Sequence, residues 1–173
     1  MKNNHIIILA FLGILVLVSY YIVLGKWVKT DSNYANHPFW FGLDNRLVNI
    51  LIMFQILAVI GFLVGVGSWL KNPPKSGIMS RDFFGIDTLF LTIAIFFISA
   101  ALWPLTTYYK KTILTVLVLI ITAISCILLL AGSVEETNPR WYIFLGFMFL
   151  CITTVLGDAV VWNAKYISQY IYG

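Results

Sequence analysis

The chain has 173 residues, of which 61% are hydrophobic and 10% charged, with a formal net charge of +4. Soluble domains carry roughly 25% charged residues, so this composition excludes an ordinary soluble domain. The few charges gather between the apolar stretches and include no basic run with interleaved aromatics, so we expect contact with anionic lipid headgroups and no nucleic-acid partner.

Five apolar stretches follow one another along the chain: residues 6–25, 47–70, 83–108, 113–131 and 141–162. A helix rises about 1.5 Å per residue and needs about 20 residues to cross a hydrocarbon core about 30 Å thick. The stretches are close to that length and lack the alternation of a membrane β-barrel. The sequence therefore predicts an all-α, polytopic transmembrane helical bundle with five membrane-spanning helices, in a single membrane domain over residues 1–173.

The tryptophans support the same boundaries. They lie at or near the ends of the stretches, as Trp27, Trp40, Trp69, Trp103, Trp141 and Trp162. An indole ring prefers the headgroup level, where the ring stays in an apolar layer and its N–H reaches water. The tryptophans therefore predict the ends of the spans independently of hydropathy.

An odd number of spans places the two chain ends on opposite sides of the membrane. We call the side of the N-terminus side A and the side of the C-terminus side B. Lysines and arginines divide almost evenly between the predicted connections on the two sides. Their distribution therefore does not decide which side faces the cytoplasm.

A line of small residues marks one face of the second stretch: Ala58, Gly61, Gly65 and Ser68 recur at spacings of three and four. Small residues at this spacing let the backbone of another helix approach closely. We expect this face to pack against a neighbouring helix of the same chain. The alternative is a groove that a ligand enters.

Asp158 is the candidate functional residue, because a charge inside a membrane is costly and is usually paired or functional. It lies one turn inside Trp162, toward side B. Arg46 and Asn49 open the second stretch on that side, and Lys165 follows the fifth stretch. We expect these four polar residues to form one cluster at a common depth. The cluster is either a structural pair of Asp158 with Arg46 or Lys165, or part of a substrate or ion pathway.

Enzymatic chemistry has little support. The two histidines, His5 and His37, lie near predicted membrane edges, and no phosphate loop, dinucleotide fingerprint or nucleophile motif is present in the sequence. We therefore expect neither an enzyme nor a bound metal or cofactor.

The first connection carries the motif His37-Pro38-Phe39-Trp40-Phe41-Gly42. Together with five predicted helices in a chain of this size, it resembles the translocator (TSPO) family of tryptophan-rich membrane proteins. The resemblance implies a pocket for an apolar small molecule. The stretch 83–108 departs from the family pattern, because it contains no asparagine and has its one tryptophan near its end.

Three functional interpretations follow. A structural or accessory membrane component needs only packing and headgroup contacts, with a membrane-protein partner or a homo-oligomer in the lipid bilayer. A small channel or transporter would use the polar cluster around Asp158 and Arg46, and a TSPO-like protein would bind an apolar molecule between helices. The first ranks highest, because the sequence shows no ring of charges, filter loop or pair of broken helices.

Overall fold

The computed structural model describes residues 3–28, 45–136 and 140–171. It confirms the all-α five-helix bundle. The elements in chain order are α1 (Asn3–Val28), α2 (Asn45–Lys71), the 3₁₀-helix η3 (Ile78–Ser80), β1 (Asp82–Phe83), β2 (Ile86–Asp87), α3 (Thr88–Tyr108), α4 (Thr112–Val134), α5 (Trp141–Cys151), the π-helix η4 (Ile152–Trp162) and α6 (Asn163–Ile171).

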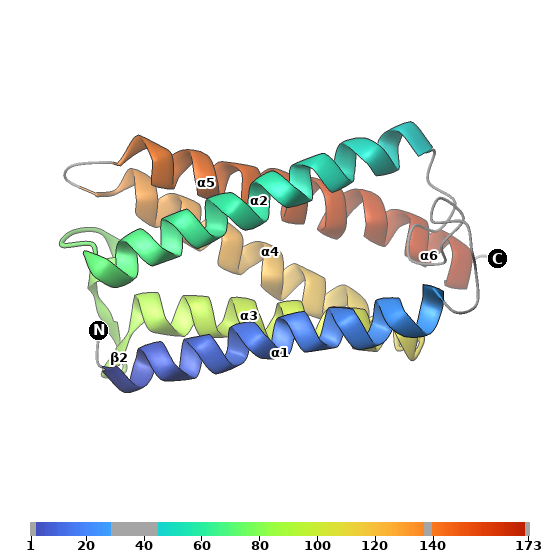
Figure 1. Ribbon diagram of the computed structural model, residues 1–173, viewed down its shortest axis with the longest axis horizontal. Coiled ribbons are helices and arrows are strands. Elements are labelled where there is room, and N and C mark those ends of the chain that lie inside the picture. Colours follow the sequence, from blue (N-terminus) through green and yellow to red (C-terminus); the bar gives the residue numbers. More distant parts are fainter. Residues whose placement is uncertain (1–2, 29–44, 137–139, 172–173) are drawn as a thin grey trace.

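The long helices run side by side along the molecule (Figure 1). Helix α1 packs on α3, and α2 packs on α5, while α4 contacts both α3 and α5 and so joins the two pairs. Helix α1 begins at one end of the bundle and α6 ends at the other (Figure 1). This arrangement is the one expected for an odd number of spans.

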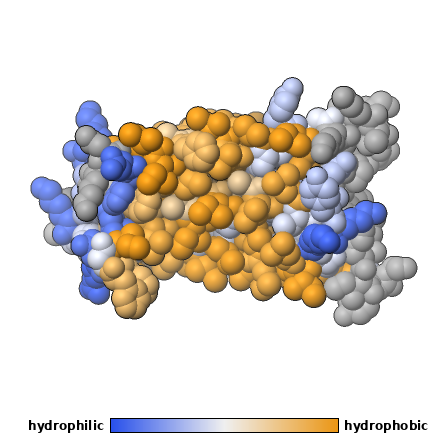
Figure 2. Space-filling model, turned by 90° about the horizontal axis from the view of Figure 1, so that it is seen from below, coloured by the Kyte–Doolittle hydropathy of each residue, from blue (hydrophilic) through white to orange (hydrophobic). Residues whose placement is uncertain are grey.

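Within the described residues, five helical segments are long and apolar enough to cross a membrane: Asn4–Val23, Arg46–Lys71, Thr88–Tyr108, Thr112–Val134 and Trp141–Ser168. In Figure 2, hydrophobic residues cover the middle of the visible face, and hydrophilic residues gather toward its two ends. Length, composition and surface pattern together indicate a multi-pass membrane protein.

The third span begins later than the sequence indicated. Residues 82–87 form a two-stranded antiparallel hairpin that pairs Asp82 with Asp87 and Phe83 with Ile86. Positive φ angles at Phe84 (51°) and Gly85 (78°) turn the chain between the strands. Asp87 then caps α3, because its side-chain oxygen accepts a hydrogen bond from the backbone N–H of Phe90 at 3.1 Å.

The fifth span differs from the prediction in two ways. It continues past Trp162 through α6, and its middle section, η4, has the wider i→i+5 hydrogen bonding of a π-helix. Asp158 lies within this π-helical section. The polar residues after Trp162 therefore belong to the same continuous helical segment, which extends toward side B.

Three of the tryptophans face inward at the ends of the bundle. The exposed fractions of Trp69, Trp103 and Trp162 are 0%, 3% and 2%, whereas Trp141 is 71% exposed. Trp69 and Trp103 donate their indole N–H groups to partners inside the protein, Glu136 and the Tyr20 hydroxyl. The prediction that these rings lie near the ends of the spans is consistent with the fold, but the N–H groups of Trp69 and Trp103 do not rely on interfacial water.

Candidate functional site

The small-residue face of α2 lies against α5. A Cβ atom built on Gly61 would stand 2.5 Å from the Cα atom of Gly146, closer than real Cβ atoms come to backbone. A Cβ atom on Gly65 would stand 2.9 Å from the ring of Phe147. Ala58 is buried, and the Ser68 hydroxyl is 3.1 Å from that of Tyr142. The two helices therefore meet backbone to backbone near Gly61.

The four residues of the predicted polar cluster have different surroundings. Arg46, Asn49 and Lys165 are exposed, and Asp158 is half-buried. Gly157 lies beside Leu51, which brings η4 to the Arg46 end of α2. No ion pair or hydrogen bond joins Asp158 to Arg46 or Lys165 in the described parts of the chain.

An aromatic cluster occupies the same side-B end of the bundle. The indole N–H of Trp103 donates to the Tyr20 hydroxyl at 2.8 Å, and the Trp103 and Trp162 rings meet edge to face at 5.2 Å. Tyr166 stacks on Trp162 with ring centroids 4.9 Å apart. This cluster draws α1, α3 and the end of the fifth span together.

A second polar cluster, at side A, was not predicted. Glu136 and Arg140 form an ion pair with Oε1 and Nη2 2.7 Å apart, and the same Glu136 oxygen accepts the Trp69 indole N–H at 2.9 Å. Arg140 also donates to the Ser68 hydroxyl at 3.2 Å and to the Asn72 carbonyl at 3.1 Å. The hydrogen bond with Glu136 raises the pKa of Arg140. We call these five residues the side-A network.

Glu135, the neighbour of Glu136, accepts two hydrogen bonds from the connection that follows α2. One of its carboxylate oxygens accepts the backbone N–H of Ile78 at 2.7 Å, and its carbonyl accepts the Ser76 hydroxyl at 3.2 Å. Gly77 passes so close that a Cβ atom there would stand 2.7 Å from the Cβ of Glu135. The connections after α2 and after α4 are thus held together at side A.

Most hydroxyl groups in the spans bond to their own helix. Each donates to a carbonyl three or four residues earlier, at 2.6–3.1 Å: Ser19, Ser99, Thr106, Thr107, Thr115, Thr122, Ser125, Ser133 and Thr153. Hydroxyls bonded in this way have given their donor to the backbone. These bonds stabilise the spans from within.

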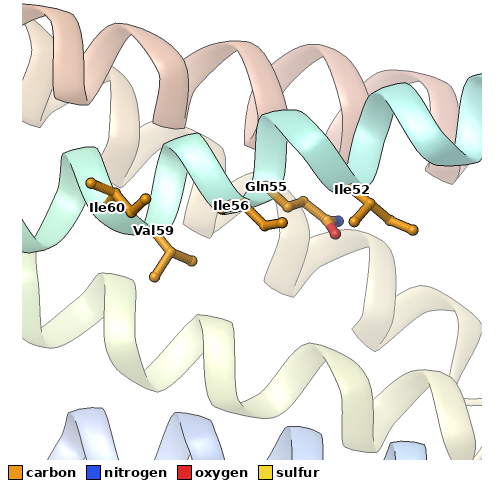
Figure 3. Close-up of a pocket in the computed structure, with 5 residues that line it drawn as sticks. All are labelled: Ile52, Gln55, Ile56, Val59 and Ile60. Atoms are coloured by element: carbon orange, nitrogen blue, oxygen red, sulfur yellow. The ribbon is translucent and has the colours of Figure 1, made fainter.

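A shallow groove of about 290 Å³ lies along one side of α2, lined by Ile52, Gln55, Ile56, Val59 and Ile60. Figure 3 shows these side chains along neighbouring turns of the helix. The Gln55 amide is the polar group of this lining, and it has no hydrogen-bond partner among the residues that the structure describes. The groove is thus mostly apolar with one unpaired amide.

Within the described residues, no three His, Cys, Asp or Glu side chains come together where they could hold a metal ion. His5 stacks on Phe90 with ring centroids 4.1 Å apart. The motif at residues 37–42, which carries the resemblance to the translocator family, lies outside the described residues.

Comparisons with protein families, curated proteins and solved structures gave no significant match.

Proposed function

We propose that the chain is a structural or accessory component of a membrane rather than an enzyme, associating with another membrane protein or with copies of itself. The observation that carries this proposal is how the polar side chains are used. Those of the side-A network bond to one another, and the hydroxyls of the spans bond to their own helices. Used in this way, these groups stabilise the bundle, which supports a structural role.

The least buried helices are the natural contact surface for a partner. Only 17% of the apolar windows of α1 and α2 are buried inside the bundle, against 44% for the other three spans. On α1, the most exposed apolar side chains follow one another at helical spacing: Ile7, Phe11, Ile14, Leu17 and Tyr21. Association between helices in lipid is driven by close van der Waals packing, so a partner surface must be complementary in shape to these large side chains.

Purification in mild detergent tests this proposal. We expect a partner in fixed stoichiometry, or a homo-oligomer of defined mass. Leu17→Ala with Tyr21→Ala should weaken that association without lowering the melting temperature of the chain. Leu117→Ala serves as the control, because Leu117 is an exposed leucine on α4. A monomer with no partner in native membranes would refute the proposal.

A second candidate function is an ion or proton pathway at side B. Asp158 favours it, because this acidic residue lies in a π-helical section and has no ion partner within the described chain. π-helical sections are frequent at functional sites, and acidic residues within spans often belong to proton relays. Proteoliposomes loaded with a pH-sensitive dye should show flux that Asp158→Asn abolishes and Asp158→Glu retains. No flux from the parent protein would exclude this function.

A further inference from the structure

The hairpin between η3 and α3 presents its apolar residues outward. Phe84, at its tip, is 90% exposed, Phe83 is 56% exposed and Ile86 is 43% exposed. The two phenyl rings contact each other edge to face at 4.6 Å. A hydrogen bond from the Thr88 N–H to the Arg81 carbonyl, 3.0 Å long, closes the base of the hairpin.

The backbone at the tip disfavours the residue that occupies it. Positive φ at both central residues is typical of a tight hairpin turn that prefers Asn-Gly or Asp-Gly. The second position is Gly85, but the first is Phe84, with φ of 51°. Such an angle is unfavourable for a bulky side chain. Since the Phe84 ring is almost fully exposed, packing inside the protein does not compensate for this strain.

The position and charge of the hairpin indicate what its tip contacts. The hairpin directly precedes Thr88, the first residue of a predicted membrane span, so it lies at the side-A boundary of the bilayer. Lys71, Lys75 and Arg81 are exposed on this side. Several carboxylates there already have partners: Asp87 caps α3, Glu135 accepts from Ile78 and Glu136 pairs with Arg140. Among the described residues exposed on this side, basic Lys71, Lys75 and Arg81 outnumber acidic Asp82 and Glu135.

We infer that residues 81–87 are an interfacial anchor, in which Phe83 and Phe84 insert at the boundary between headgroups and acyl chains. Lys71, Lys75 and Arg81 face the phosphates of anionic lipids. Aromatic rings favour that depth, and basic side chains gain energy close to an anionic surface. The anchor fixes the depth and tilt of α3 in the side-A leaflet, whatever partner the bundle has.

A spin label on Ile86→Cys reads the depth of the hairpin with both phenyl rings in place, because Ile86 is the cross-strand partner of Phe83. The protein carries Cys126→Ala and Cys151→Ala and is reconstituted alone into phosphatidylcholine vesicles with or without phosphatidylglycerol. We expect the label to meet dissolved oxygen more often than a water-soluble nickel complex, and more so when phosphatidylglycerol is present. The same label on Lys75→Cys should show the opposite preference.

Phe84→Asn is the decisive variant, because asparagine adopts positive φ more readily than phenylalanine. It should shift the label on Ile86→Cys toward the nickel complex while leaving the melting temperature equal or higher, so misfolding cannot explain the shift. A label on Ile86→Cys that collides with the nickel complex as often as the Lys75→Cys control would overturn the inference. That result would indicate that the hairpin contacts a protein partner instead of lipid. An unchanged label in Phe84→Asn would overturn it as well.

Discussion

The contact between Gly61 and Gly146 gives the sharpest test of the packing. In Gly61→Ala, the new methyl group would stand 2.5 Å from the Gly146 Cα and 2.8 Å from its carbonyl oxygen. Both atoms belong to backbone, so neither can move aside by a change of rotamer. Helices α2 and α5 must separate by about 1 Å to restore ordinary van der Waals distances of about 3.5–4.0 Å. Overpacking of this kind typically costs about 1–3 kcal/mol.

Thermal unfolding in detergent, followed by near-UV circular dichroism, measures this cost. For a chain of this length, 1 kcal/mol corresponds to about 2–4 °C, so Gly61→Ala should lower the melting temperature by about 2–12 °C. Gly67→Ala is the matched control, since a Cβ atom there meets nothing within 4 Å. It should be neutral or slightly stabilising, because alanine favours helix over glycine by about 1 kcal/mol.

Gly146→Ala should cost about as much as Gly61→Ala, because its methyl group would meet the Gly61 carbonyl at 2.5 Å. The double variant should cost less than the two single losses added together, since one separation of the helices relieves both contacts. If Gly61→Ala melts at the same temperature as Gly67→Ala, the close approach of α2 and α5 does not exist and the reasoning fails.

Three further predictions concern the polar residues and the topology. A double-mutant cycle of Glu136→Gln and Arg140→Gln should give a coupling of about 1–3 kcal/mol, and a coupling near zero would show that their ion pair does not hold α4 to α5. Gln55→Leu should stabilise the protein in detergent by about 1 kcal/mol, because it removes an amide without a partner in the described chain; a lower melting temperature would reveal a hydrogen bond to a bound molecule. Reporter fusions after Lys75 and after Gly173 should face opposite sides of the membrane, and the same side for both would mean that one span is missing.

Hydropathy predicted the five helices because membrane insertion depends on a whole span of about 20 residues and tolerates single exceptions. The start of α3 was harder to predict, since Phe83, Phe84 and Ile86 extend the apolar stretch beyond the helix. What separates them from it is local: the turn at Gly85 and the Asp87 cap. The π-helical form of η4 depends on how the fifth span packs, and no residue in the sequence predicts it.

The side-A network could not be predicted from neighbouring residues. Trp69 and Glu136 are 67 positions apart in the sequence. They meet because α2 packs along α5, and Glu136 lies in the connection that leads from α4 into α5. In the sequence, Glu135 and Glu136 stand in the connection between the fourth and fifth apolar stretches. A signal was present in the sequence, since Arg140 follows Glu136 by four positions, which is the spacing of a helical ion pair.

The two ends of the bundle differ in how their charged residues are satisfied, and this difference separates the functional alternatives. At side A, Glu136 meets Arg140 and the Trp69 indole, so that end is closed by bonds within the protein. At side B, Asp158 is half-buried, and neither Arg46 nor Lys165 pairs with it within the described residues. An acidic residue within a membrane span is usually paired with a charge or used in function. The Asp158→Asn flux measurement therefore tests side B, whereas the Gly61 and Glu136 variants test the contacts that stabilise the fold.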